Sequence, residues 1–188
     1  MLGHCFNYKP VGKTTLNGIQ TDLYSFKCTY NLAYVLEVEH HPDNIYIIKF
    51  FQKNHKDSSY RYSLLNKKSI RKGSSGAKNF LIILNTIIKV VLEIYSKNKS
   101  SSFGFIGSPT KDELNKKVNK ANINIDGTVA QTKRFNTYGI YVKRYFSPEK
   151  FEHIEISTSS SYLIKSKKSN LKLKSVELFF QNYIELYC

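Results

Sequence analysis

Apolar and polar residues alternate along much of the first third of the chain, and this period of two is typical of β-strands. In "NLAYVLEVEH", for example, Leu36 and Val38 share one face, while Glu37 and Glu39 share the other. The pattern predicts strands at residues 21–30, 31–40, 45–51 and 60–65. Because only short polar turns separate them, we expect an antiparallel meander.

The longest apolar stretch of the chain follows a segment rich in glycine and basic residues. The text "NFLIILNTIIKVVLEIY" predicts a helix from about Ala77 to Lys97. Its residues are apolar nearly all round through Phe80–Ile88, so we expect this helix to be buried against the sheet. The short run "SSFGFIG" at 101–107 predicts a buried strand after it.

The second half of the chain is more polar. Residues 108–131 are rich in Lys and Asn and predict an insertion, with a short surface helix at 111–120 that Thr110 and Glu113 would cap. The further predicted elements are an amphipathic helix at 132–146, strands at 151–157 and 161–165, and a last helix at about 172–187 within the C-terminal segment 170–188. This order predicts an α+β fold, and the length of 188 residues fits a single domain over 1–188.

The chain is strongly basic, with a net charge of +15. A basic protein favours a polyanionic partner such as nucleic acid. However, only four of its 29 basic residues are Arg, which is the residue preferred for reading bases, so the composition argues against sequence-specific DNA recognition. The abundance of Lys, Asn, Ile and Tyr also agrees with codon composition and solubility as the origin of the charge, and both interpretations stay open.

Three cysteines, Cys5, Cys28 and Cys188, stand far apart, and no Cys/His cluster has the spacing of a metal site. We therefore expect reduced thiols and no metal. The N-terminus has no signal-peptide pattern, and the uncharged apolar runs are too short to span a bilayer. The expectation is a soluble, cytoplasmic protein without a membrane partner.

The segment before the buried helix is a candidate anion site. Its residues are Arg71, Lys72, Gly73, Ser74, Ser75 and Gly76. A helix N-terminus offers unpaired N–H groups and a partial positive charge, and glycine lets the backbone approach a phosphate closely. The alternative is a surface turn in which a serine caps the helix.

Two stretches resemble the GNAT acetyltransferase superfamily: "RKGSSGA" (71–77) and "RFNTY" (134–138), with a likeness in element order over about residues 20–157. In that family a loop of pattern Q/R-x-x-G-x-G/A holds the pyrophosphate of acyl-CoA. Here Ile70 stands at the Gln/Arg position and Ser75 at the second Gly position. The resemblance implies that acetyl-CoA binds at 71–76, in an enzyme or in a catalytically inactive relative.

The same resemblance implies roles for three side chains. Tyr138 would protonate the departing CoA thiolate, and Glu37 or Glu39 would act as the general base. The alternatives are a tyrosine at the edge of the core and a solvated strand face. Uncharacterised small bacterial proteins, often from mobile elements, are also similar in "GSPT" (107–110) and "TKRFNTY" (132–138), which supports the fold rather than a function.

Two other classes of function stay open. The stretch "YVKRYF" interleaves basic and aromatic residues, as nucleic-acid-binding segments do, although Val142 and Phe146 are expected to point into the core. The candidate nucleic-acid residues are Lys133, Arg134, Lys143 and Arg144, in a toxin–antitoxin or phage-defence component. The third class is an interaction module that forms a homo-oligomer through the C-terminal helix.

Overall fold

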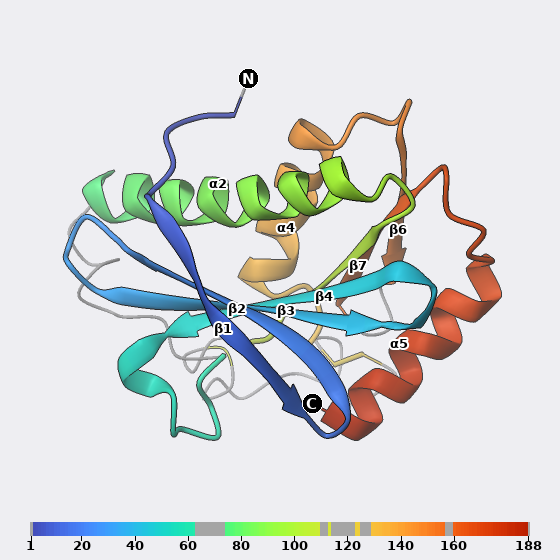
Figure 1. The fold of residues 1–188 in the computed structure, drawn as a ribbon, viewed down its shortest axis with the longest axis horizontal. Coiled ribbons are helices and arrows are strands. Elements are labelled where there is room, and N and C mark those ends of the chain that lie inside the picture. The colour runs from blue at the N-terminus through green and yellow to red at the C-terminus, as the bar shows by residue number, and fades with distance from the viewer. Residues whose placement is uncertain are drawn as a thin grey trace. The chain divides into compact units, whose positions relative to one another are not determined.

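The structure is a computed structural model of the chain, and it describes residues 2–62, 74–109, 113, 123–124, 129–156 and 160–187. Over these residues the chain forms seven β-strands and three α-helices, which confirms the predicted α+β class (Figure 1). The chain divides into two compact units. The first comprises Met1–His41 and Ile47–Asn98, and the second comprises Pro42–Tyr46 and Lys99–Cys188.

The first part of the chain carries four strands in the order β1-β2-β3-β4. Their bounds are β1 (Tyr8–Leu16), β2 (Ile19–Lys27), β3 (Ala33–His41) and β4 (Ile45–Gln52). Strands β1, β2 and β3 pair antiparallel, as expected for a meander. The first three predicted strands, at 21–30, 31–40 and 45–51, lie close to β2, β3 and β4.

The structure differs from the prediction at both ends of the meander: β1 was not predicted, and the last predicted strand does not form in its described part. Strand β1 has no alternating pattern because nearly all of its residues are exposed on both faces. A turn at Asn17 and Gly18, both with positive φ, joins it to β2. The strand predicted at 60–65 is wrong in its described part, since 60–62 form turns after a short 3-10 helix, η2 (Lys53–His55).

Helix α2 (Ser74–Lys97) packs on the face of the sheet that carries Tyr8, Phe26 and Tyr34. The rings of Phe26 and Tyr34 stack with centroids 5.5 Å apart. The Lys89 ammonium of α2 lies 5.5 Å from the centroid of the Tyr8 ring of β1. The helix is longer than predicted, because Ser74–Gly76 belong to its first turn. Its burial is also less complete than predicted, since Leu81 is 46% exposed.

The second unit contains three antiparallel strands in the order β5-β7-β6. The elements are β5 (Ser102–Ile106), α4 (Lys133–Tyr145), β6 (Phe151–Ile156), β7 (Ser161–Ser166) and α5 (Leu173–Tyr187). Each lies within a few residues of its predicted position. Helix α5 buries Val176, Phe180 and Tyr183, spaced four and three residues apart, as the apolar stripe predicts.

None of the helices that the structure describes combines the length and the apolar character needed to cross a membrane. Of the helix predicted at 111–120, only Glu113 is described. Its carboxylate accepts a hydrogen bond from the backbone N–H of Lys133 at 2.9 Å, so it lies at the start of α4.

Candidate functional sites

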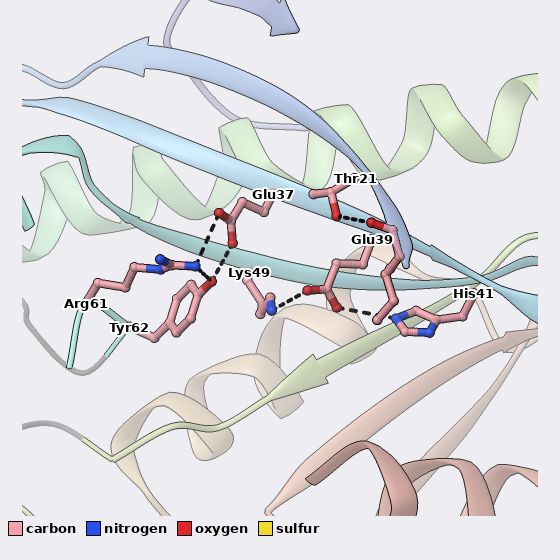
Figure 2. A network of polar contacts seen from close by, with 8 residues as sticks. Thr21, Glu37, Glu39, His41, Lys49, Arg61 and Tyr62 are labelled. Carbon is pink, nitrogen blue, oxygen red and sulfur yellow. Dashed lines mark hydrogen bonds and ion pairs between the residues drawn. The ribbon is translucent and has the colours of Figure 1, made fainter. Parts of the chain in front are cut away.

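The two carboxylates that the sequence analysis singled out belong to a polar network on β3. Glu37 and Glu39 lie two residues apart and so share one face of the strand, opposite to the face that carries Leu36 and Val38. Figure 2 shows that Glu39 points toward Lys49 and His41, while Glu37 points toward Arg61 and Tyr62.

Glu39 is the more deeply buried carboxylate, with only 5% of its surface exposed. One of its oxygens forms an ion pair with the Lys49 ammonium of β4. The other lies 3.3 Å from Nε2 of His41. Thr21 of β2 is its cross-strand neighbour and is also buried. A buried carboxylate with these contacts is held in place by charge and by packing together.

Glu37 is held in place by two side chains of the segment after β4, Arg61 and Tyr62. Its carboxylate accepts a 2.5 Å hydrogen bond from the Tyr62 hydroxyl, and the Arg61 guanidinium lies 3.7 Å away. Arg61 also donates to the Tyr62 hydroxyl at 2.7 Å. Burial, followed by the charge and the hydrogen bond of Glu37, raises the pKa of Tyr62, and Arg61 opposes that rise only in part. Tyr62 is therefore a proton donor to Glu37 at neutral pH.

This network changes the interpretation of the strand face. The sequence leaves open that the two carboxylates lie on a solvated strand face. They do not, because both are largely buried and contact cationic side chains. A carboxylate in such contacts can accept a proton only if the neighbouring cation moves away or if a bound substrate displaces that cation. The sequence analysis missed Lys49, Arg61 and Tyr62, and the single Lys in the apolar run "IYIIKFF" was the signal for the first of them.

The candidate anion site at the start of α2 is described only in part. Arg71, Lys72 and Gly73 lie outside the described residues, whereas Ser74, Ser75 and Gly76 form the first helical residues. One turn later, the Asn79 side-chain oxygen accepts a 3.2 Å hydrogen bond from the backbone N–H of Thr29. The N-terminal end of α2 is therefore anchored to the turn between β2 and β3.

The second unit holds the two sequence motifs "GSPT" and "TKRFNTY" in direct contact. The Thr132 hydroxyl donates a 2.6 Å hydrogen bond to the carbonyl of Gly107, at the end of β5. The same hydroxyl accepts from the backbone N–H of Phe135 at 3.1 Å and so caps α4. One buried side chain thus joins the strand to the helix.

Thr132→Val should lower the free energy of unfolding by about 2 kcal/mol, since it removes a helix cap and leaves the Gly107 carbonyl without its hydroxyl donor. Thr137→Val is the matched control, because the Thr137 hydroxyl bonds only within α4, to the carbonyl of Lys133, near the surface. Urea denaturation of both variants measures the difference. Equal, small effects would contradict a bridging role for Thr132.

Tyr138, the proposed acid, is 8% exposed and lies in the second unit, whereas Glu37 and Glu39 belong to the first. Its ring packs on Phe105 of β5, with centroids 5.7 Å apart. Burial raises the pKa of its hydroxyl, and the nearby Arg134 lowers it in smaller measure. Tyr138 therefore carries a proton at neutral pH, as a general acid must. Its side chain is buried, however, so little of it is exposed to a ligand.

The candidate nucleic-acid residues of α4 do not all reach solvent. Lys133, Lys143 and Arg144 are exposed, but Arg134 is only 5% exposed, so it is not a surface contact for phosphate. Its spacing of four residues from Tyr138 places both side chains on the buried side of the helix. Val142 and Phe146 point into the core, as expected from the sequence.

In the described part of the chain, no group of three or more His, Cys, Asp or Glu residues could hold a metal ion. Cys5 and Cys28 are free thiols. Comparison with known proteins adds no relationship, since no protein-family model, no curated protein and no solved structure matches this chain.

Proposed function

We propose that this chain is a GNAT-like protein that binds a phosphate-bearing ligand, specifically an acyl-CoA, at the N-terminal end of α2. The observation that carries the proposal is the order of elements. A meander of β1–β4 is followed by α2, then by β5, then by α4 with its aromatic residue and Tyr138, and then by β6. This is the order that the resemblance to the GNAT superfamily implies.

The chemistry of the α2 terminus supports an anionic ligand. The helix is 24 residues long and has no acidic residue in its first turn, so no side chain of that turn neutralises its partial positive charge. Arg71 and Lys72 precede the helix in sequence, separated from its first residue by Gly73, and both favour phosphate. The anchoring of Asn79 to Thr29 holds this end of the helix in place for a ligand.

If the protein also catalyses transfer, the reaction would be the attack of an amine on the thioester carbonyl of acyl-CoA. A C–N bond forms, the C–S bond breaks, the amine loses a proton and the thiolate gains one. Tyr138 is the proposed donor to the thiolate. Glu37 is the better candidate for the base than Glu39, because its side chain is more exposed, at 13% against 6%, and lies 3.7 Å from its cation.

Acetyl-CoA should raise the melting temperature of the protein. At about 100 times its dissociation constant, a ligand that binds only the folded state adds about 2.7 kcal/mol to the free energy of unfolding. A thermal-shift titration at physiological salt measures this, and Arg71→Ala/Lys72→Ala should abolish most of the shift. Desulfo-CoA and CoA should behave alike, because the phosphates carry the contact.

The matched control is Lys9→Ala/Lys27→Ala, which removes the same charge from exposed positions of β1 and β2. The control should retain the full shift. The proposal fails if wild-type protein shows no shift with acetyl-CoA, or if the control variant loses as much of the shift as Arg71→Ala/Lys72→Ala.

A further inference from the structure

A polar groove with a volume of about 470 Å³ lies within the second unit. The 3-10 turn η1 (Pro42–Asn44) lines one part of it, and the segment from Lys168 to Lys172, between β7 and α5, lines another. Nearly all its side chains are polar, and Leu171 is the one apolar residue of its described lining. A volume of this size lies within the range of small-ligand sites.

The groove stands in the most basic stretch of this unit. Residues 165–176 contain no acidic residue, and four lysines there are exposed: Lys167, Lys168, Lys172 and Lys174. None of the four forms an ion pair with another described residue, unlike Lys165, whose ammonium lies 3.0 Å from the Glu152 carboxylate. Lys168 and Lys172 line the groove directly.

Hydrogen bonds and packing fix the backbone that carries these lysines. The Ser166 hydroxyl donates to the carbonyl of Lys99 at 2.5 Å and accepts from the N–H of Lys168 at 3.1 Å. Leu171 and Val176 are buried on either side of Lys172. A charged segment that is ordered before binding loses less conformational entropy when a ligand arrives.

We propose that this groove binds the sugar-phosphate backbone of a nucleic acid. In sequence, the exposed lysines extend beyond the two that line the groove, to Lys167 and Lys174, and four cations suit several successive phosphates better than one. Amide and hydroxyl groups of Asn170, Ser169 and Ser175 can bond to sugar and phosphate oxygens. No aromatic ring lines the described groove, so base stacking does not favour single strands over a duplex there.

Asp43 gives the groove a marker that can be tested. Its carboxylate is the one acidic group of the described lining, and it faces a site that also holds Lys168 and Lys172. A phosphate in the groove is repelled by this carboxylate. Removal of the charge by Asp43→Asn should therefore tighten binding, whereas removal of the lysines should weaken it.

The test is fluorescence anisotropy of a labelled single-stranded oligonucleotide and of its duplex, at salt concentrations from about 50 to 200 mM. We expect both to bind, with affinity that falls steeply with salt. Lys168→Ala/Lys172→Ala should weaken single-strand binding about tenfold or more at low salt and flatten the salt slope by about 1.4, or two contacts at about 0.7 each. Asp43→Asn should bind more tightly than wild type.

Lys9→Ala/Lys27→Ala is the charge-matched control, since it removes two exposed cations of β1 and β2, which belong to the first unit and not to the groove. If this control weakens binding as much, the net charge and not the groove is responsible, and the proposal is overturned. Stronger binding to polyglutamate or to anionic vesicles than to the oligonucleotide would also overturn it. Both double variants should keep the acetyl-CoA shift, so this proposal and the proposed function can fail separately.

Discussion

Glu39→Ala should lower the free energy of unfolding by about 3–5 kcal/mol, because it removes the carboxylate that pairs with Lys49, whose side chain is only 15% exposed. The Lys49 ammonium forms its ion pair with Glu39 on a face where the Glu39 side chain is only 6% exposed. His41 Nε2 loses its carboxylate contact in the same variant. Urea denaturation followed by circular dichroism measures the loss, which should appear as a lower midpoint at an unchanged slope.

Two further variants separate charge from packing. Glu39→Gln/Lys49→Met removes both charges while it keeps most of the volume, and it should recover much of the lost stability. Glu37→Ala should cost less than Glu39→Ala, because Arg61 is 26% exposed and solvent screens its charge. A loss below about 1 kcal/mol for Glu39→Ala would mean that Lys49 reaches water instead of staying buried.

The outcome also bears on catalysis. A large loss of stability in Glu39→Ala would mean that Glu39 stabilises the sheet. Glu37 would then be the better candidate for contact with a substrate. Glu37 already accepts a hydrogen bond from Tyr62, so a bound amine would compete with that hydroxyl for one oxygen. The stability measurement therefore narrows the proposed mechanism before any activity is assayed.

The sequence predicted best the elements whose two sides differ in polarity. Strand β3 and helix α4 place apolar residues at regular spacing, so their period was visible, and Thr132 marked the start of α4. Strand β1 could not be found from its period, because exposure on both faces removes any alternation. The Asn17–Gly18 turn was its only local signal, since this dipeptide favours hairpins.

The candidate sites were harder to predict, because their partners are distant in sequence. The shared face of Glu37 and Glu39 followed from their spacing. Their contacts with Lys49 and Arg61 did not, since those depend on how β4 and the turns after it pack. The apolar text around Tyr62 suggested a strand, but its described residues, 60–62, form turns. The Arg61 guanidinium there lies 5.1 Å from the Phe51 ring.

Gly107→Ala should lower the free energy of unfolding by about 3 kcal/mol, at the upper end of the cost of overpacking. A Cβ atom at this position would lie 2.7 Å from Cβ of Phe135 and 2.8 Å from the carbonyl oxygen of Ser160. Neither neighbour is the flexible end of a side chain, so relief requires that α4 or the turn before β7 move away from β5. Such a movement would stretch the 2.6 Å bond from Thr132 to Gly107 and the 2.9 Å bond from the Gly107 N–H to Ser160.

Gly139→Ala is the matched control, because it adds the same methyl group within α4. Its Cβ would meet the Tyr162 hydroxyl at 2.5 Å, so the Tyr162 ring must shift and its 3.1 Å bond to Glu155 must lengthen. No backbone atom has to move, and alanine is a better helix former than glycine, which offsets part of the cost. We expect a cost near 1 kcal/mol, the low end for an added methyl group. If Gly107→Ala proves equally mild in urea denaturation, β5 and α4 can separate at little cost. If it is severe, close packing against α4 requires the glycine of "GSPT". The contact of this motif with "TKRFNTY" then serves the fold rather than a reaction.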